Sequence, residues 1–326
     1  MSVDSQILSA LRSAGHDSVS GADLSHELGI TRAAIWARIE ELRSLGYVIE
    51  ASPHHGYRLV EVPDVLHADD LLSLLKKNRV IGRELQVFQE TTSTNDVIER
   101  LAGDGVREGA VVFAEKQTKG RGRLGRKWIS PAGKGLWFSV LLRPALLPQA
   151  ATQLTVAAAT SLVRAIEQTT SLTADIKWPN DILINGRKTA GVLTELSAEL
   201  DRIHYIVLGI GIDVNLNESD FPPEIRKIAT SLKLEAQREI RRADLAAALL
   251  RELDHDYQRI CRGDFQSVCH EWQERCITLG KMVKIRIGDR IITGHAEALD
   301  DNGALLLRTE HGHLEQIIGG DVTMAA

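Results

Sequence analysis

The chain has 326 residues, of which 44% are hydrophobic and 25% charged, and its formal net charge is −5. Domains run at roughly 100–200 residues, so this length predicts two or three of them in a globular protein. No run of about 18 or more apolar residues occurs, which excludes a membrane-spanning helix, and the acidic, amphipathic residues 1–14 are not typical of a signal peptide. We therefore expect a cytoplasmic protein with no membrane partner, and the net charge gives no sign that the chain as a whole binds nucleic acid.

The cysteines Cys261, Cys269 and Cys276 lie in one late segment and lack the spacing of metal ligands. Cys269 and Cys276 are seven residues apart and would share one face of a helix. We interpret all of them as small buried hydrophobic residues. This pattern fits the reducing cytoplasm, and we expect no metal site built from a cluster of protein ligands.

Residues 5–11 and 20–28 predict two short helices, and residues 31–45 predict a third. Gly29 ends the second helix, and Thr31 caps the third after a tight turn. Two short helices across such a turn are typical of a helix-turn-helix. The expected apolar face of the third helix consists of Ile35, Ile39 and Leu42.

Two expected strands, residues 47–51 and 57–60, follow the third helix and flank a short turn. A hairpin in this place is typical of a wing, whose tip reaches a phosphate or the minor groove. We therefore predict a winged helix-turn-helix domain that binds DNA over residues 1–62. The residues expected to face DNA are Thr31, Arg32, Trp36, Arg43, His54 and His55.

The charge of this domain leaves an alternative open. Residues 1–60 carry five Lys or Arg and seven Asp or Glu, so the domain is not basic and could be a helical protein-interaction domain. The helix lengths, the turn and the wing favour operator DNA. So few cations predict modest affinity, which implies a dimer on a two-part operator.

A run of hydroxyl and amide residues from Thr91 to Asp96 separates an expected strand, 85–89, from a helix. The first N–H groups of a helix lack partners within it, so such a junction suits a polar ligand. Simple capping by Thr92 or Ser93 is the alternative, but capping would use one hydroxyl rather than several.

Glycines alternate with arginines in the segment 115–128. Glycine lets backbone N–H groups turn toward an anion, and arginine adds planar charged forks suited to phosphate or carboxylate. The loop has almost no apolar side chains, so we expect it to be mobile when empty and to close over an anionic ligand. It lacks the Gly-Lys-[Ser/Thr] ending of a P-loop, and a nucleic-acid patch or a solvated linker is the alternative. The alternating residues are Gly120, Arg121, Gly122, Arg123, Gly125 and Arg126.

The dipeptide Asn185-Gly186 lies between two expected strands, 181–184 and 188–196, and is a strong hairpin signal. Lys188 follows the turn on an otherwise apolar strand, which suggests an anion for it to pair with. A snorkelling lysine at the edge of a sheet is the alternative.

Residues 205–216 predict a long apolar strand that contains Gly209 and Gly211, with Asp213 and Asn215 at its end. Glycine inside a strand indicates the close approach of a ligand or of backbone. The Gly-x-Gly is weak evidence by itself, because it lacks the strand-to-helix context of a dinucleotide site.

The remaining segments complete a multidomain α+β prediction. From residue 279 onward, short strands joined by turns predict a small β-barrel or sandwich of roughly SH3 size. Residues 135–143 alternate and predict a strand. Further strands are expected at 110–114 and 174–178, and helices at 68–77, 150–168, 241–262 and 264–276. The turns are Gly288-Asp289, Asn302-Gly303 and His311-Gly312.

Four motifs resemble, in order and spacing, those of the bifunctional biotin–protein ligases that also repress the biotin operon, the class II biotin protein ligases. The resemblance covers essentially the whole chain. It implies a winged helix at 1–62, a central mixed-sheet α/β ligase domain of the class II synthetase type at 63–277, and an SH3-like domain at 278–326. The motifs are Ser93-Thr94-Asn95, Gly120-Arg121-Gly122-Arg123, Lys177-Trp178-Pro179-Asn180-Asp181 and Lys188-Thr189-Ala190-Gly191.

The resemblance implies a two-step reaction. The carboxylate of biotin attacks the α-phosphate of ATP, and a lysine of a biotin carboxyl carrier protein, an acetyl-CoA carboxylase subunit, then attacks the biotinyl-AMP. Preplaced cations must cancel the repulsion between two anionic reactants in a site shielded from water. Lys188, Arg121 and Arg123 would supply that charge, with Mg²⁺ on the phosphates of ATP. Asp181 would orient or deprotonate the incoming lysine.

The same resemblance assigns a site for biotin and the adenylate. Two departures put contacts in doubt, because Asp213 stands where many relatives carry Asn and Leu124 stands where polar or basic residues are common. The first concerns an adenine or metal contact and the second a secondary phosphate contact. The implied site residues are Ser93, Thr94, Asn95, Gln117, Gly120, Arg121, Gly122, Arg123, Trp128, Lys188, Gly191, Leu193, Gly209, Asp213 and Asn215.

Regulation also follows from the resemblance as a hypothesis. The adenylate would order loops and favour a homodimer, and only the dimer would hold two winged helices at operator spacing. The protein would then repress biotin synthesis genes in response to biotinyl-AMP.

Other functions stay open at this point. A lipoate–protein ligase has similar chemistry, although the Gly-Arg-Gly-Arg and Lys-Trp-Pro-Asn-Asp runs favour biotin. A biotin sensor without catalysis is disfavoured by the intact Lys188, Arg121 and Arg123. A protein whose Gly/Arg loop binds RNA would lose affinity steeply with salt and would be indifferent to biotin.

Overall fold

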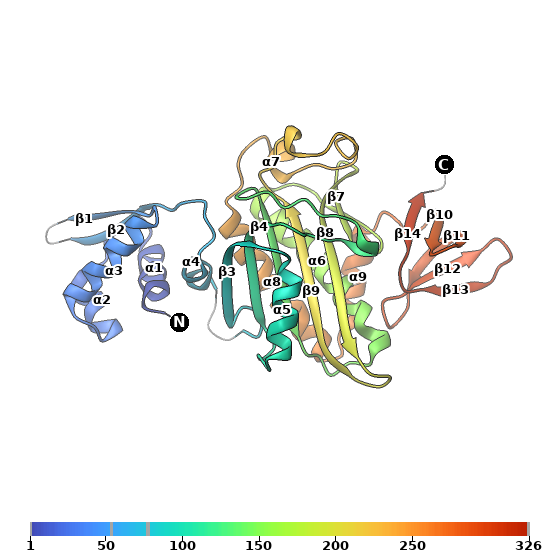
Figure 1. Ribbon diagram of the computed structural model, residues 1–326, viewed down its shortest axis with the longest axis horizontal. Coiled ribbons are helices and arrows are strands. Elements are labelled where there is room, and N and C mark those ends of the chain that lie inside the picture. Colours follow the sequence, from blue (N-terminus) through green and yellow to red (C-terminus); the bar gives the residue numbers. More distant parts are fainter. Residues whose placement is uncertain (1, 53–54, 76–78, 325–326) are drawn as a thin grey trace. The chain divides into compact units, whose positions relative to one another are not determined.

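The computed structural model describes residues 2–52, 55–75 and 79–324. The chain divides into two compact units, Met1–Lys77 and Asn78–Ala326 (Figure 1). In the ranges that the structure describes, no helix is long and apolar enough to cross a membrane.

The first unit contains a helix-turn-helix followed by a two-stranded wing. Gly29 ends α2 in the left-handed region at φ 66°, and the hydroxyl of Thr31 caps α3 by accepting the N–H of Ala34. Strands β1 and β2 pair antiparallel, as predicted for the wing. The elements are α1 Val3–Ser13, α2 Gly21–Leu28, α3 Arg32–Ser44, β1 Val48–Ser52, β2 Gly56–Glu61 and α4 Ala68–Ser73.

The core of this unit joins all of its helices except α4. Ile35, Ile39 and Leu42 of α3 are buried together with Ile7 and Leu11 of α1, which confirms the predicted apolar face of α3. Periodic burial of this kind holds short helices that would be marginal in isolation.

Helix α4 packs on α1 and is shorter than predicted, because it ends at Ser73. An ion pair links Arg12 of α1 to Asp70 of α4, whose side chain is fully buried. A buried carboxylate needs such a partner, so this pair fixes α4 to the winged-helix unit.

A mixed sheet of seven strands organises the described part of the second unit, in the order β3-β4-β5-β9-β8-β7-β6. Strands β3 and β4 run parallel, and the other neighbours run antiparallel. This confirms the predicted mixed-sheet domain. The strands are β3 Glu84–Thr91, β4 Ala110–Gln117, β5 Gly135–Leu142, β6 Asp175–Lys177, β7 Asp181–Ile184, β8 Arg187–Ala198 and β9 Ile203–Asp213.

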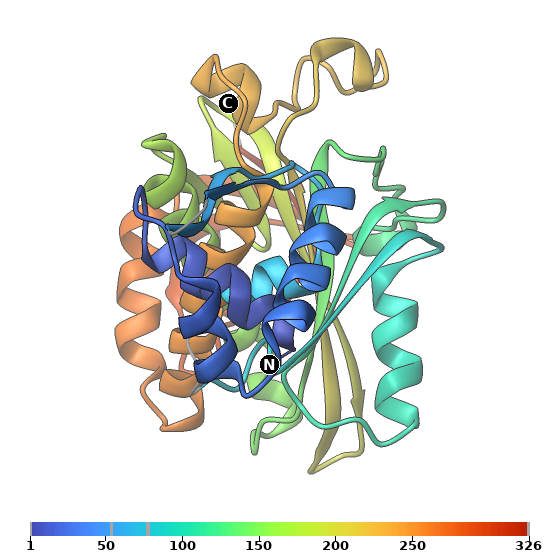
Figure 2. The same cartoon turned by 90° about the vertical axis from the view of Figure 1, so that its left-hand side faces the viewer.

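Helices cover both faces of this sheet, with α5 on one face and α6, α8 and α9 on the other (Figure 2). All residues of β5 are therefore buried, and the strand predicted at residues 135–143 is confirmed. The helices are α5 Thr94–Gly103, α6 Thr152–Thr170, α7 Leu232–Ala236, α8 Arg242–Cys261 and α9 Phe265–Arg275, with 3₁₀ turns at Arg123–Gly125, Pro148–Ala151 and Glu218–Asp220.

The hairpin between β7 and β8 turns at Asn185 and Gly186, whose φ angles are 50° and 76°. Positive φ at both central residues matches the right-handed twist of the strands, so the predicted hairpin is confirmed. The turn carries Lys188 onto the first part of β8.

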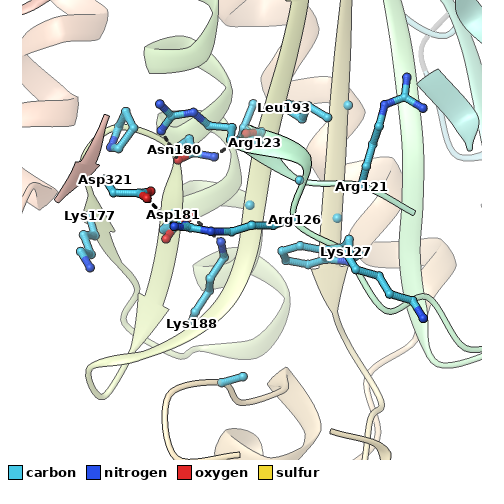
Figure 3. Close-up of a pocket in the computed structure, with 18 of the residues that line it drawn as sticks. Arg121, Arg123, Arg126, Lys127, Lys177, Asn180, Asp181, Lys188, Leu193 and Asp321 are labelled. Atoms are coloured by element: carbon cyan, nitrogen blue, oxygen red, sulfur yellow. Dashed lines mark hydrogen bonds and ion pairs between the residues drawn. The ribbon is translucent and has the colours of Figure 1, made fainter. Parts of the chain in front are cut away.

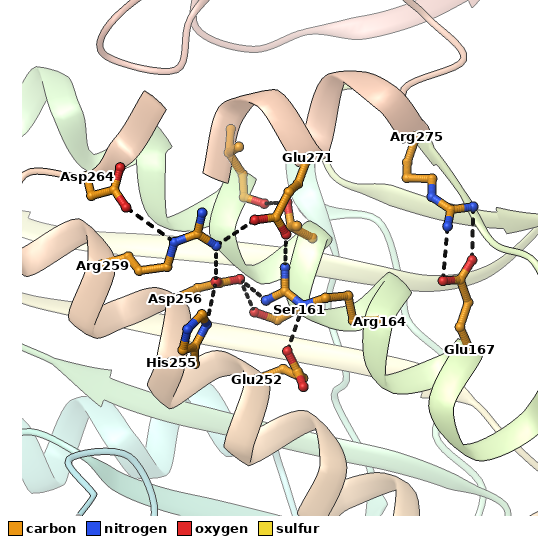
Figure 4. A network of polar contacts seen from close by, with 12 residues as sticks. Ser161, Arg164, Glu167, Glu252, His255, Asp256, Arg259, Asp264, Glu271 and Arg275 are labelled. Carbon is orange, nitrogen blue, oxygen red and sulfur yellow. Dashed lines mark hydrogen bonds and ion pairs between the residues drawn. The ribbon is translucent and has the colours of Figure 1, made fainter. Parts of the chain in front are cut away.

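An ion network joins α6, α8 and α9 on the face of the sheet opposite α5 (Figure 4). Nε of Arg164 lies 2.6 Å from Glu252, and its Nη2 lies 2.5 Å from Asp256. Arg259 contacts Asp256 at 3.1 Å and Glu271 at 2.7 Å. The carboxylate of Asp256 is almost completely buried, and both arginines share it.

The C-terminal part of this unit is an antiparallel sheet in the order β13-β12-β11-β10-β14. Its turns fall at the predicted positions, which confirms a small β domain. The strands are β10 Met282–Ile287, β11 Arg290–Leu299, β12 Leu305–Thr309, β13 Leu314–Ile317 and β14 Asp321–Met324.

The cysteines differ from the prediction in two respects. Cys269 is buried as expected, but Cys261 is exposed at the end of α8. Cys276 is buried and lies just beyond α9, which ends at Arg275, so it does not share a helix face with Cys269.

Candidate active site

A cavity of about 880 Å³ lies in the second unit, beside the start of α5 and strands β7, β8 and β9. It gathers all of the predicted catalytic and ligand-binding residues except Gly120 and Asn215. The predicted residues that line it are Ser93, Thr94, Asn95, Gln117, Arg121, Gly122, Arg123, Trp128, Asp181, Lys188, Gly191, Leu193, Gly209 and Asp213.

Hydroxyl and amide groups converge at one end of the cavity, around the first turn of α5. The N–H of Thr94 donates to Oε1 of Gln117 at 2.9 Å, and the Thr94 hydroxyl lies 2.7 Å from that of Ser139. The Ser139 hydroxyl donates to Oδ1 of Asn95 at 2.5 Å. Ser93 precedes the helix, but its side chain makes no capping bond. A capping bond of Ser93 therefore does not account for this run, whose polar groups bond to one another at the wall of the cavity.

Glycines in β8 and β9 make room for side chains of the site. A Cβ on Gly209 would lie 2.3 Å from Oδ1 of Asn95, and one on Gly211 would lie 2.7 Å from the Trp128 ring. A Cβ on Gly191 would lie 3.2 Å from the same ring. The close approach predicted from these glycines is therefore present, but it is made by side chains rather than by a ligand or backbone.

The Gly/Arg loop folds back on itself. Gly120 faces the returning chain, since a Cβ there would lie 2.5 Å from the carbonyl oxygen of Trp128. The N–H of Gly122 donates to the carbonyl of Arg126 at 2.6 Å. Gly125 adopts φ 72°. Gly120 thus serves packing in this structure, and the N–H of Gly122 is used within the loop rather than turned toward the cavity.

Arg121 forms ion pairs that hold it against the polar end of the cavity. Its Nη1 lies 2.5 Å from Asp96, and its Nη2 lies 3.1 Å from Glu195. Glu195 also accepts a hydrogen bond from Asn95 at 2.6 Å. Burial lowers the pKa of Arg121, but the bonds to Glu195 and Asp96 outweigh this and raise it. Figure 3 shows this side chain extending away from the Lys188 region.

The other loop arginines reach the opposite wall. Nη1 of Arg123 donates to Oδ1 of Asn180 at 3.1 Å, and burial lowers the pKa of Arg123. Arg126 forms an ion pair with Asp321 of β14, as Figure 3 shows. The loop is therefore held between the central sheet and the C-terminal sheet.

Lys188 lies in the cavity next to two carboxyl groups. Its Nζ is 2.5 Å from Oδ1 of Asp181 and 5.2 Å from the ring centroid of Trp128. Asp213 is only 7% exposed, and burial raises its pKa well above the usual range, although the charge of Lys188 acts in the opposite direction. Lys188 thus has an anionic partner inside the cavity, which argues against a snorkelling edge lysine.

Positive charge dominates the cavity. Among the described residues that line it, eight are basic and three are acidic. Sequence reasoning missed part of this set. A sequence signal existed for three of its members, because Arg126 and Lys127 continue the Gly/Arg run and Lys177 begins the Lys-Trp-Pro-Asn-Asp motif. No sequence signal linked the C-terminal strands to the site. The basic residues absent from the predicted site are Arg126, Lys127, Lys177, Lys284 and Arg286.

Asn215 is a structural residue here rather than a lining one. Its amide donates to the carbonyl of Ile240 at 2.9 Å and accepts the Ile240 N–H at 3.0 Å. Both ends of the side chain are thereby paired with the backbone of Ile240, and the ligand contact of Asn215 stays a prediction.

The residues predicted to face DNA fall into two groups. Arg32 is exposed on α3, Trp36 is 58% exposed there, and His55 is exposed in the wing turn. Thr31 is used as a cap. Arg43 donates to the carbonyl of Ile49 at 2.9 Å and pairs with Glu40, so it braces α3 against β1. His54 lies outside the described residues.

Comparison with known proteins decides the family. The chain is 40% identical over 311 residues to a bifunctional ligase/repressor of Bacillus subtilis, with 95% of both chains covered. The chain belongs to the biotin protein ligase family. The predicted resemblance is thereby confirmed. Within this chain, the Biotin/lipoate A/B protein ligase family matches residues 87–213, an HTH domain matches residues 4–58, and the Biotin protein ligase C terminal domain matches residues 278–324.

Two further relatives of this biotin protein ligase cover different parts of it. A bifunctional ligase/repressor of Escherichia coli is 31% identical over 94% of this chain and 92% of its own. The structure of a biotin protein ligase from Aquifex aeolicus in complex with biotin and ATP is 32% identical, with a TM-score of 0.63 over 74% of this chain and 99% of that chain. The predicted architecture, with a helix-turn-helix before a mixed-sheet ligase domain and a small β domain, is confirmed.

Proposed function

We propose that this biotin protein ligase uses ATP to form biotinyl-5′-AMP and transfers biotin to a lysine of a biotin carboxyl carrier protein, and that it represses biotin synthesis genes. One observation carries the ligase assignment. Hydrogen-bonding groups at the start of α5 and a surplus of cations around Lys188 share one cavity. That is what a site needs in order to bring a polar carboxylate to a phosphate.

The adenylation step depends on cancelling charge repulsion. A carboxylate oxygen of biotin forms a bond to the α-phosphorus of ATP, and the bond to the bridging oxygen breaks as pyrophosphate leaves. We propose that Ser93, Thr94 and Gln117 hold biotin and that Lys188 moves from Asp181 to the phosphate. A fixed cation in a site shielded from water stabilises the charge that develops in the transition state. Arg121 and Arg123 add charge as the loop closes.

Magnesium would enter on the phosphates of ATP. Among the described residues, no group of three or more His, Cys, Asp or Glu side chains could hold a metal ion. Mg²⁺ would neutralise phosphate charge, and we assign it no cluster of protein ligands.

The transfer step needs a base. The amine of the acceptor lysine attacks the carbonyl carbon of the anhydride, AMP leaves, and the amine loses a proton. Asp181 is our candidate to orient that amine or to accept its proton. Its carboxylate lines the cavity and is freed when Lys188 turns to the ligand. The apolar ring of biotin would pack against Trp128, Gly191, Leu193 and Gly209.

The direct test is mass spectrometry of a carboxyl-carrier domain after incubation with the protein, biotin and MgATP. The proposal expects the mass of one biotinyl group on one lysine, and no change when ATP is omitted. An unmodified carrier with a folded enzyme would reject it. Biotin-dependent ATP–pyrophosphate exchange separates a ligase from a pure sensor, and replacing biotin by lipoate tests the lipoate alternative.

Repression is proposed to follow the adenylate. Binding of the adenylate would favour a homodimer, which would place two winged helices on a two-part operator, with Arg32, Trp36 and His55 nearest the DNA. These activities fit a cytoplasmic protein. Footprinting with and without biotin plus ATP tests the coupling, and equal occupancy in both would reject it.

A further inference from the structure

Strand β8 has a bulge directly after Lys188. Ile182 of β7 is paired with Ala190 of β8. The next residue of β7, Leu183, is paired with Lys188, so the residue between the two pairs, Thr189, is extra. A bulge of this kind bends a strand and changes the direction of the side chain beside it.

The bulge places Lys188 on the same side of β8 as Gly191. Successive side chains of a regular strand point to opposite faces, so residues three apart would face away from each other. Both residues nevertheless line the cavity, and a Cβ on Gly191 would lie 3.4 Å from Nζ of Lys188. The extra residue thus brings the amine into the cavity, but it also interrupts the pairing of β7 with β8 at this point.

A segment that precedes α7 binds the backbone of Lys188. The N–H of Lys188 donates to the carbonyl of Ile228 at 2.8 Å, and its carbonyl accepts the N–H of Thr230 at 2.8 Å. Ile228 and Ala229 also line the cavity. The position of Lys188 therefore depends on how residues 228–230 are held relative to the hairpin.

Glu235 of α7 joins this segment to the hairpin turn. Its Oε1 accepts the Thr230 hydroxyl at 2.6 Å and Nη2 of Arg187 at 2.6 Å, and its Oε2 accepts Nδ2 of Asn185 at 2.7 Å. The side chain of Glu235 is only 5% exposed. Burial raises the pKa of Glu235, but the three bonds outweigh this and lower it. Hydrogen bonds to an ionised carboxylate are among the strong ones, so this contact fixes both ends of the segment that carries Lys188.

We propose that Glu235 is a positioning residue for Lys188, because it holds the hairpin turn against residues 228–230 and so presents the amine to the ligand from a fixed backbone. The inference deepens the proposed ligase function and rests on it. Glu235 is not among the described residues that line the cavity, so it acts through Lys188 rather than on the ligand. Fixed placement matters because a displacement of about 1 Å can cost a reaction ~10²-fold in rate.

The experiment compares Glu235→Ala with Arg187→Ala, which breaks the same contact from the hairpin side, in the full chain. Glu239→Ala is the matched control, because Glu239 lies close by in the sequence and its exposed carboxylate pairs with Lys233 at 3.0 Å. Glu235→Ala is also made in a Lys188→Ala background. The measurements are kcat and the KM for biotin in biotin-dependent ATP–pyrophosphate exchange, and the midpoint of thermal unfolding.

We expect Glu235→Ala to lower kcat by about tenfold or more and to leave the KM for biotin within about twofold of wild type, since the groups at the start of α5 are untouched. Arg187→Ala should cause a smaller loss in the same direction, because Asn185 keeps its bond to the carboxylate. Glu235→Gln, which keeps one oxygen acceptor at the same reach, should retain part of the rate, and Glu239→Ala should match wild type.

The Lys188→Ala background separates positioning from a general loss of stability. There Glu235→Ala should change the residual exchange by less than about twofold, because no amine is left to position. A residue that only stabilised the fold would lower the rate in both backgrounds.

Two results would overturn the assignment. One is exchange at the wild-type kcat in Glu235→Ala. The other is an equal loss in the two backgrounds, which would make Glu235 a residue of the fold alone. If Glu235→Ala does not fold, Arg187→Ala, whose side chain is 42% exposed in the wild type, carries the same comparison. If the wild-type chain shows no biotin-dependent exchange at all, the proposed function itself fails, and that outcome is distinct from both.

Discussion

The two faces of the central sheet use charge in opposite ways. Behind the sheet, Arg164 and Arg259 share carboxylates from the two helices α8 and α9, and each cation has more than one acidic partner (Figure 4). In the cavity on the other face, eight basic and three acidic side chains line the wall among the described residues. Figure 3 labels several of both kinds. A balanced network stabilises the fold, whereas a surplus of one sign leaves charge available for a ligand.

This contrast predicts which substitutions harm folding and which harm function. Removing one partner of a buried ion pair leaves a charge in the protein interior without full compensation, which destabilises the fold. Removing a cation from a crowded positive cavity relieves repulsion, so the fold should tolerate it while the reaction does not.

The largest expected effect is on stability, at Asp256. Asp256→Ala removes the buried carboxylate that Arg164 and Arg259 share, and because both arginines keep other acidic partners it should lower the free energy of unfolding by about 3 kcal/mol, the lower end expected for a broken buried pair. Urea unfolding of the full chain measures it. The control Glu90→Ala, which breaks an exposed pair with Lys116, should change little. Equal losses in the two variants would remove the distinction between the faces.

Lys188 should behave in the opposite manner. Lys188→Ala should reduce biotin-dependent ATP–pyrophosphate exchange by about 10²–10³-fold, the size found for preorganised electrostatic groups, with the midpoint of thermal unfolding nearly unchanged. Lys281→Ala serves as the control for loss of a lysine. Exchange at near wild-type rates in Lys188→Ala would show that the surplus charge is not used in this step.

Asn215 tests the distinction between residues that stabilise the fold and residues that bind the ligand. Asn215→Ala leaves the backbone N–H and carbonyl of Ile240 unpaired and should cost about 1–3 kcal/mol of stability. The KM for ATP, measured below the unfolding transition, should not change. A raised KM with unaltered stability would return Asn215 to the ligand site.

Asp213 should make stability depend on pH. Its folded pKa is raised by burial, so the folded state retains a proton that the unfolded state has lost, and stability falls as pH rises from the unfolded pKa toward the folded one. Asp213→Asn removes this loss. Urea unfolding at several pH values should therefore show the advantage of Asp213→Asn growing by at most about 1.4 kcal/mol per pH unit. An advantage that is constant with pH would contradict the raised pKa.

Local chemistry explains how much could be predicted from the sequence. The turn at Asn185-Gly186, the cap at Thr31 and the apolar stripe on α3 follow from short-range rules, and the structure confirms each. The motif residues that line the cavity were also predicted, because they occur as compact runs along the chain.

What could not be predicted depends on long-range pairing. Nothing near Arg126 in the sequence indicates that Asp321 is its partner, and nothing in β10 indicates that Lys284 faces the cavity. Asn215 carries a polar side chain at a strand end, as a ligand residue would, but its partner Ile240 is supplied by a distant segment. Such contacts are fixed by the tertiary fold rather than by local pattern.

The central claim is that the unbalanced charge of the cavity serves the adenylate, and a crystal structure with biotinyl-5′-AMP tests it most directly. The account predicts that Nζ of Lys188 has left Asp181 and lies about 2.7–3.2 Å from an oxygen of the ligand, with the Gly/Arg loop over the phosphate. A ligand-bound structure in which Lys188 still pairs with Asp181 and the loop is turned to solvent would contradict it.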